Sequence, residues 1–371
     1  MPATIARYGR NSVLGLAAML STGLLAIPAT APAAAQREKP LRVVSIDMEG
    51  GGGTLLVTPQ GQSVLLDAGW PAGVRGTPLA QSSANRILAA TRALGIARID
   101  YLIITHYHLD HVGGIQDLLA VMTVGEIIDH GPNREMPPAG TVAGHDAIAS
   151  LYARYQALLG GRKHRSVKAG DRIAIGPLTL NIVSADRALL PRTLEGAGGP
   201  TPGCDAPRLP DMGNGGEENP RSIGVIASYG KARIVSLADL TADVEIGLVC
   251  PVNRLGRADL LVVSHHGSQL STTPPLLAAL QPRVALMANG ATKGGDAPVF
   301  QTVAAAPSHP AIWQLHYAIR SPEVNRPADF IANPEGREDG GFSLDVSVWP
   351  DRRMKVTNAR TGFSEDYPAT R

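Results

Sequence analysis

The chain has 371 residues, long enough for one large domain or for two of ordinary size. Hydrophobic residues make up 44% of it and charged residues 18%, a balance that is typical of globular proteins and argues against a disordered chain. It contains 34 Lys and Arg against 32 Asp and Glu, a formal net charge of only +2. Charge therefore does not favour long nucleic acid as a substrate, although it does not exclude a local basic groove.

Residues 1–35 have the pattern of a secretory signal peptide. Arg7 and Arg10 precede an apolar run at Ser12–Pro28, and Ala33–Ala35 offers small residues for cleavage. The alternative is a membrane anchor, but the run is short for a span of about 20 residues. We therefore expect an exported protein, periplasmic or secreted, with no membrane span after cleavage. Its mature chain has a formal charge of zero, because the signal holds two basic residues and no acidic one.

The first half of the mature chain alternates apolar segments with turn-rich ones. The predicted strands are Leu41–Ile46, Thr54–Thr58, Ser63–Asp67, Tyr101–Thr105 and Glu126–Ile128. The predicted helices are Ser83–Leu94, Val112–Met122 and, on the surface, Asp146–Leu159. The run Gly50–Gly53 lacks the Gly-Lys-Ser and the helix start of a phosphate-binding loop, so it predicts a hairpin loop near the pocket.

The second half begins with a hairpin and continues as a series of strands and helices. The predicted strands are Arg172–Ile175, Leu178–Val183, Ile223–Ser228, Arg233–Leu237, Leu260–Ser264, Val284–Ala288, Ile312–Leu315, Phe342–Val348 and Met354–Asn358. The predicted helices are Thr241–Val249, Pro274–Leu280 and Val299–Ala305. Residues 191–220 are rich in Gly and Pro and have no period, which indicates a long surface insertion or lid.

Each half ends a buried strand in histidines, which suggests two sheets packed face to face with helices outside, in one domain at residues 36–371. The chain has two cysteines, Cys204 and Cys250, and neither has the Cys-x-x-Cys spacing of a zinc site. An oxidising compartment would permit a disulfide between them, and two buried thiols are the equal alternative.

The strongest chemical signal is the sequence His106-x-His108-x-Asp110-His111 directly after an apolar strand. Imidazole nitrogen and carboxylate oxygen are the usual ligands of zinc apart from sulfur. Because the strand stops just before the motif, these side chains lie on a loop at one edge of a sheet. His106 and His108 can point at one ion, and Asp110 and His111 at a neighbouring one.

This motif resembles the signature of the metallo-β-lactamase superfamily, and the mature chain follows the order of that family to about residue 320. It is more closely similar to the ComEC-type branch, on three segments: Asn219–Ser222 (Asn-Pro-Arg-Ser), Ser236–Leu240 (Ser-Leu-Ala-Asp-Leu) and Val263–Ser268 (Val-Ser-His-His-Gly-Ser). The resemblance implies an α/β fold, an αββα four-layer sandwich, with a two-metal site at the edge of the sheets.

The resemblance also implies roles for single residues. His106 and His108 would bind the first metal, Asp110, His111 and His266 the second, and Asp239 would bridge both. Asp110 and Asp239 would be the catalytic carboxylates. His265 would line the pocket, although the roles of His265 and His266 could be exchanged. The family usually has Gly before the bridging Asp, where this chain has Ala238.

Many members of the superfamily supply a further His to the first metal, and this chain has no clear equivalent. His130, His145 and His164 lie in the interval, and Asn219 occupies the segment where the ComEC-type branch has Asn. His145 and His164 lie in polar sequence and favour exposure. His130 ends a strand and is as consistent with a place at the pocket as with a structural role. His316, which ends a late strand, could donate to a leaving group, but a structural role is favoured.

The expected activity is metal-dependent hydrolysis of a small molecule. Two divalent ions, zinc in the first instance with manganese or iron as alternatives, would lower the pKa of a bridging water to give hydroxide and would polarise the scissile group. The ComEC-like segments favour a phosphodiester. A β-lactam or lactone is the alternative substrate, because the same metal pair serves both chemistries. An alternative of another class is a non-catalytic metal-binding surface protein.

Overall fold

The computed structural model describes residues 39–74, 81–137, 144–205, 216–335 and 340–369. The predicted signal peptide at residues 1–35 lies outside these ranges. Within them, no helix combines the length and the apolar character that crossing a bilayer requires.

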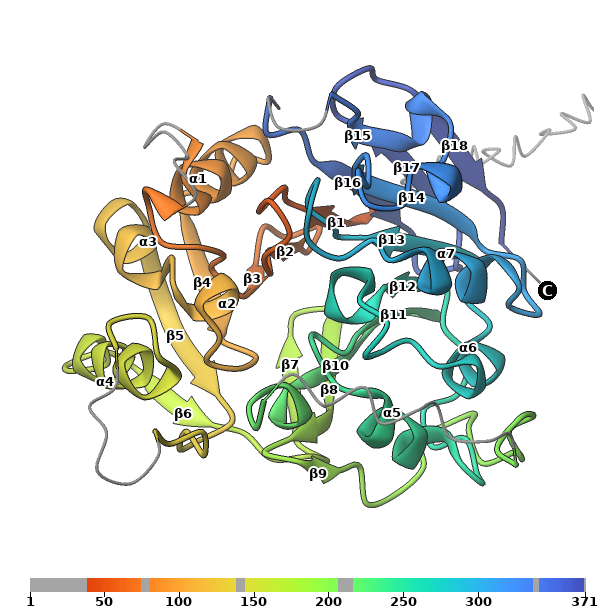
Figure 1. The fold of residues 1–371 in the computed structure, drawn as a ribbon, viewed down its shortest axis with the longest axis horizontal. Helices are drawn as coiled ribbons and strands as arrows, with labels where there is room; N and C mark the ends of the chain where they lie inside the picture. The colour runs from red at the N-terminus through yellow and green to blue at the C-terminus, as the bar shows by residue number, and fades with distance from the viewer. Residues whose placement is uncertain (1–38, 75–80, 138–143, 206–215, 336–339, 370–371) are drawn as a thin grey trace, which may run out of the picture. The chain divides into compact units, whose positions relative to one another are not determined.

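Two large sheets form the centre of the described chain (Figure 1). The first has the strand order β18 (Ser364–Tyr367), β17 (Met354–Asn358), β16 (Leu344–Val348), β1 (Leu41–Ser45), β2 (Thr54–Val57), β3 (Ser63–Leu66), β4 (Arg98–Ile103), β5 (Thr123–Asp129), β6 (His164–Ser166). Strands β3 to β6 run parallel, and the remaining neighbours pair antiparallel. The carboxyl ends of β3 and β4 therefore meet at one edge.

The second sheet has the order β15 (Ile331–Asn333), β14 (Ala311–His316), β13 (Val284–Met287), β12 (Leu260–Val262), β11 (Ala232–Ser236), β10 (Gly224–Tyr229), β8 (Leu178–Ala185), β7 (Arg172–Ile175), and β9 (Ala188–Leu189) pairs with β8. Strands β11 to β15 are parallel. The loops after these strands therefore also gather at one edge of their sheet.

Three buried apolar clusters define the layers. Side chains alternate along β1: Leu41 and Val43 join the cluster between the two sheets, whereas Val44 joins the cluster under the helices of the first sheet. That second cluster contains residues of α1 (Ser83–Ala93), α3 (Ile115–Val121) and α4 (Ile148–Leu158). The third joins the second sheet to α5 (Ala242–Val249), α6 (Pro274–Leu280) and α7 (Ala297–Ala304). Figure 1 shows these two helical groups beyond the two sheets. The predicted αββα sandwich is confirmed.

Some element boundaries differ from the predictions. The predicted helix Val112–Met122 is instead two helices, α2 (Leu109–Val112) and α3, with Gly113 and Gly114 between them. A Cβ at Gly114 would lie 2.2 Å from the carbonyl oxygen of Ala68, so the chain turns where only glycine allows this close approach. The strands β6, β9, β15 and β18 were not predicted, because β9 and β15 are too short to show a period and β6 and β18 consist mostly of polar residues.

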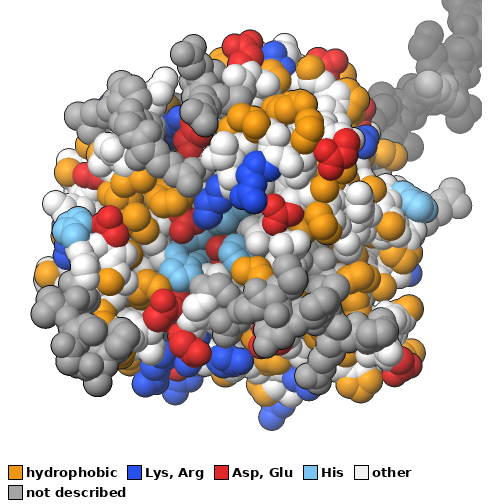
Figure 2. Space-filling view, viewed as in Figure 1, with side chains coloured by type: hydrophobic (Ala, Val, Ile, Leu, Met, Phe, Trp, Pro, Cys, Tyr) orange, Lys and Arg blue, Asp and Glu red, His pale blue; other side chains and the backbone are white. Residues whose placement is uncertain are grey.

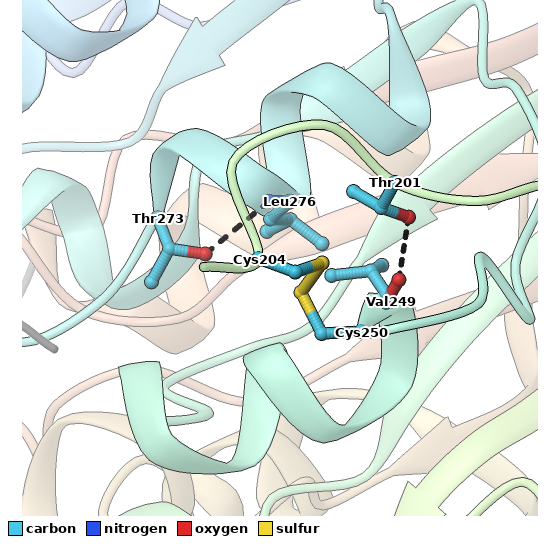
Figure 3. The surroundings of a disulfide bond; sticks show 6 residues. All are labelled: Thr201, Cys204, Val249, Cys250, Thr273 and Leu276. Atoms are coloured by element: carbon cyan, nitrogen blue, oxygen red, sulfur yellow. Dashed lines mark hydrogen bonds between the residues drawn. A yellow bond between two sulfur atoms is a disulfide. The ribbon is translucent and has the colours of Figure 1, made fainter. Parts of the chain in front are cut away.

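The predicted insertion at residues 191–220 is described on both sides of residues 206–215. Cys204 forms a disulfide with Cys250, and the Thr201 hydroxyl donates to the carbonyl oxygen of Val249, at the end of α5 (Figure 3). The question that the sequence left open is thus resolved as a disulfide. Glu218 and Asn219, near the other end, are 0% and 2% exposed. The prediction of a surface segment is therefore wrong for that end, which enters the interior and reaches the site.

Candidate metal centre

The carboxyl ends of parallel strands in both sheets supply the candidate site. Strand β4 leads to the motif at residues 106–111, and β3 leads to Asp67. In the second sheet, β11 leads to Asp239, and β12 leads to a 3-10 turn at Ser264–Gly267 that carries the two histidines. Figure 2 shows histidine side chains gathered in a hollow of this face, with acidic side chains among them and Lys or Arg side chains beside them.

Four side chains converge on one point: Asp110, His111, Asp239 and His266 are all buried, and one donor atom from each lies within 4.8 Å of all the others. The Nε2 atoms of His111 and His266 are 3.1 Å apart. Asp110 Oδ2 lies 3.3 Å from both of these nitrogens. Asp239 places Oδ2 3.3 Å from His111 Nε2 and Oδ1 3.3 Å from His266 Nε2.

Hydrogen bonds at the far side of each imidazole favour one tautomer. His111 Nδ1 lies 2.8 Å from Asp67 Oδ2, and His266 Nδ1 lies 3.3 Å from the carbonyl oxygen of Ala288. A ring that donates from Nδ1 presents an Nε2 lone pair at its other edge. Two nitrogen lone pairs and two carboxylates then face one another in a buried space, an arrangement that repels itself unless a cation lies among them. The donor set therefore fits a divalent metal ion.

The electrostatics of His111 agree with this interpretation. Burial alone would lower the pKa of His111, but the carboxylates of Asp239, Asp110 and Asp67 outweigh it and hold the pKa well above its usual value. Burial likewise acts to raise the pKa of Asp239, yet the histidines His266, His111 and His265 keep it well below its usual range. The site thus favours a positive charge at its centre, which a metal ion can supply.

Backbone strain is concentrated at the same place. Ala238, His265 and His266 have φ values of +51°, +54° and +55°, in the left-handed region that disfavours side chains. The His265 amide donates to the Ala238 carbonyl oxygen at 2.8 Å, which joins the two strained loops. The positive φ explains why glycine suits the position before Asp239, and the alanine keeps the same conformation. Such strain is typical of residues held in place for function.

Asp67 belongs to this site but was not among the predicted residues. Besides contacting His111, its carboxylate accepts from the backbone amide and the hydroxyl of Thr105, each at 2.8 Å. Thr105 Oγ1 in turn lies 3.1 Å from His106 Nδ1, so Asp67 orients two motif histidines at once. The available signal was an Asp at the end of a buried strand and before a turn, a position that the motif at residues 106–111 shares in following a buried strand.

The remaining motif residues lie beside the cluster. His106 Nε2 is 3.0 Å from His108 Nδ1 and 3.9 Å from Asp239 Oδ2. His265 Nε2 lies 3.4 Å from Asp239 Oδ2 and 3.4 Å from the Asn219 side-chain nitrogen. Among the described residues, Asn219 Oδ1 is buried and has no hydrogen-bond partner. These residues form a second group of donors, which meets the four-residue cluster at Asp239.

The other histidines of the interval have other partners. His130 is buried, with Nε2 3.1 Å from Glu218 Oε2 and its ring 4.7 Å from that of Tyr107. Of the two alternatives that the sequence left open for His130, these contacts favour the structural role. His164 contacts Asp129, and His145 is exposed beside Asp146. None of the three joins a candidate ligand group within the described ranges.

His316 is fully buried and pairs with Asp47, whose Oδ1 lies 2.7 Å from His316 Nε2. With Glu49 these residues form a second cluster of ligand-type side chains. Arg86 already pairs with both carboxylates, so their charge is compensated without a metal ion. A structural role for His316 therefore fits better than donation to a leaving group.

Glu245 on α5 contacts the segment that joins the histidine turn to α6. Its Oε2 accepts from the backbone amides of Thr272 and Thr273, at 2.8 and 3.2 Å. Burial raises the pKa of this carboxyl from 4.5 to about 7. Its contribution to stability is therefore fully present below pH 4.5, the unfolded value, and is lost as the pH rises through about 7.

Gln at position 245 stays neutral at every pH. Between pH 5 and pH 8 we therefore expect the free energy of unfolding of Glu245→Gln to rise by about 2 kcal/mol relative to that of the wild type. Urea unfolding at the two pH values measures this gain. Glu323→Gln, at an exposed position, is the control and should show no such trend. The same difference between Glu245→Gln and the wild type at both pH values would contradict the assignment.

Comparison with known proteins gives the family. The model of the Metallo-beta-lactamase superfamily matches residues 49–290, which include every candidate ligand. The chain belongs to the metallo-beta-lactamase superfamily. Members of this superfamily are mostly metal-dependent hydrolases and generally bind divalent metal ions. The candidate ligand group of Asp110, His111, Asp239 and His266 matches that chemistry.

Solved structures show weaker likenesses. A metallo-beta-lactamase from Cronobacter sakazakii, a mutant of its HARLDQ motif, is 18% identical with a TM-score of 0.31, over 53% of this chain and 60% of that one. The metallo-beta-lactamase fold protein YhfI from Bacillus subtilis is 16% identical with a TM-score of 0.34, over 61% and 71%. A diphosphatase from the PhnP family is 12% identical with a TM-score of 0.38, over 74% and 94%. None of the curated proteins compared with the chain matches it significantly.

Proposed function

We propose that the protein is an exported, two-metal phosphodiesterase of the ComEC-type branch of the superfamily. The observation that carries the proposal is the convergence of two imidazole nitrogens, 3.1 Å apart, with two carboxylates that each lie 3.3 Å from both nitrogens. Two bound divalent ions, zinc in the first instance, would supply an acidified water molecule and would neutralise charge that develops on the phosphoryl oxygens.

The residues of the site would have the following roles. Asp110, His111 and His266 would hold one ion, while His106 and His108 would hold the other, and the buried, unpartnered Oδ1 of Asn219 would offer a further oxygen donor. Asp239 contacts both groups of donors and would serve as the bridge, because a carboxylate has two oxygens with spare lone pairs. Asp110 would also orient the attacking water. Asp67 keeps His111 and His106 in the tautomers that ligation needs.

The choice of a phosphodiester rests on the three ComEC-like segments. They are far apart in the sequence, yet His265 from one of them lies 3.4 Å from Asn219 of the second and 3.4 Å from Asp239 of the third. Export is supported by the pattern of residues 1–35 and by the Cys204–Cys250 disulfide, since disulfides persist in oxidising compartments. The near-neutral chain favours a small phosphodiester over long nucleic acid.

The test is hydrolysis of bis(p-nitrophenyl) phosphate by residues 36–371, with a β-lactam assayed in parallel. Enzyme stripped by a chelator is compared with enzyme restored by zinc or by manganese. We expect phosphodiester turnover that disappears on stripping and returns with metal. Turnover of the β-lactam alone by metal-loaded protein would instead favour lactam or lactone hydrolysis. A folded chain that binds no metal would leave a non-catalytic surface protein.

A further inference from the structure

Lys293, in the loop that follows β13, extends into the metal centre from the second sheet. Its ammonium pairs with Asp110 Oδ2 and donates to the carbonyl oxygen of Gly50 at 2.7 Å. It also lies 5.3 Å from the centre of the Trp70 ring. Only 27% of the side chain is exposed. A lysine held on three sides differs from a solvated surface lysine, whose ammonium is free to move.

The backbone around Lys293 is fixed against the ligand-bearing loops. Gly295 and Asp296 donate from their amides to the carbonyl oxygens of His266 and Gly267, both at 2.9 Å. A Cβ at Gly290 would lie 2.6 Å from the carbonyl oxygen of Glu49, and one at Gly294 would lie 2.1 Å from that of His266. Glycine at these positions therefore lets the loop pack directly on both halves of the site. The ammonium has a defined position relative to Asp110 and His266.

Contact with Asp110 does not by itself compensate the positive charge of Lys293. If Asp110 holds a metal ion, as in the proposed function, its negative charge is shared with that ion. The ammonium then adds a further positive charge beside the metals, in a partly buried position where an unpaired charge is unfavourable. An anionic ligand would compensate it, and lysine commonly binds phosphoryl oxygens as a point charge.

We propose that Lys293 binds the anionic, non-bridging oxygen of a phosphodiester substrate and so selects negatively charged esters over neutral ones. This proposal rests on the proposed function for its substrate class. The negative charge of a diester lies on its non-bridging oxygens, so an ammonium beside the metals favours that ester over a neutral triester of the same shape.

The test compares Lys293→Met with Lys293→Arg, which keeps the charge. Thr292→Ala is an exposed control in the same loop, and Lys231→Met is a control for the loss of one positive charge. Lys231 precedes β11, whereas Asp239 follows it, so the control lies at the opposite edge of the sheet. Metal content, measured by mass spectrometry, and the unfolding midpoint must stay unchanged in each variant that is compared.

Three measurements separate substrate binding from a structural role. Calorimetry gives the affinity for inorganic phosphate, and kinetics give kcat/KM for bis(p-nitrophenyl) phosphate and for its neutral methyl ester. We expect Lys293→Met to weaken phosphate binding about tenfold and to lower kcat/KM for the anionic diester by a similar factor, with the neutral ester changed less than about threefold. Lys293→Arg should recover much of the loss.

Equal loss for the charged and the neutral ester, or equal phosphate affinity in Lys293→Met and the wild type, would overturn the role of Lys293. Failure of the proposed function gives a different result. In that case the metal-loaded wild type does not hydrolyse the diester, while the phosphate titration still reports on the lysine.

Discussion

Replacing Asp239 with Asn is expected to reduce turnover by about two orders of magnitude or more. Asp239 is 2% exposed and contacts His111, His265 and His266 with its two oxygens at 3.3 to 3.4 Å. An amide keeps the shape of the side chain but offers only one acceptor oxygen, and its nitrogen would face imidazoles or a metal ion. The variant therefore loses the bridging group and the negative charge together.

The measurement is phosphodiester hydrolysis together with the metal content of the purified variant. Asp243→Asn is a matched control, because Asp243 is an exposed aspartate four positions along the chain, in the first turn of α5. We expect the control to keep wild-type activity. His108→Ala tests the other donor group, and we expect a loss of similar size. Near-normal activity in folded Asp239→Asn and His108→Ala would rule out this site as the catalytic centre.

Removing the disulfide is expected to have the largest effect on stability. The bond joins residues separated by 46 positions and ties the start of the insertion to the end of α5 (Figure 3). A cross-link over a loop of this length stabilises a fold by about 4 kcal/mol through the entropy of the unfolded chain. This is a large part of the total, since domains are typically stable by about 5–15 kcal/mol.

Urea unfolding of a Cys204→Ala, Cys250→Ala double variant measures the loss. Wild-type protein unfolded in the presence of a reducing agent is an independent comparison, and the two should agree because both lack the cross-link. A loss below about 1 kcal/mol would contradict the expectation and would mean that the insertion is held by its other contacts. Those include the Thr201 hydroxyl on Val249 and the Leu194 amide on the carbonyl oxygen of Arg254.

The sequence by itself indicated the fold class and most residues of the candidate metal centre. Strands near the centre of the two sheets are buried on both faces, so β1 and β12 are short apolar runs that stand out in the sequence. The motif at residues 106–111 is local, and its chemistry can be inferred from residue types and spacing alone. Asp239 and His266 could be assigned only through the resemblance, because a single Asp or a single His-Gly pair does not by itself indicate a metal site.

Tertiary structure decided which distant side chains share the site. Asp67 contacts His111 across 44 positions, and Lys293 contacts Asp110 across 183, because parallel strands of two sheets end at a common edge. His130 and His316 have sequence surroundings like those of ligands, but Glu218 and Asp47 pair with them inside the fold. Whether Cys204 and Cys250 form a disulfide likewise depended on where the fold places the insertion relative to the end of α5. Spacing along the chain reports local geometry, whereas these contacts are set by how the two sheets pack.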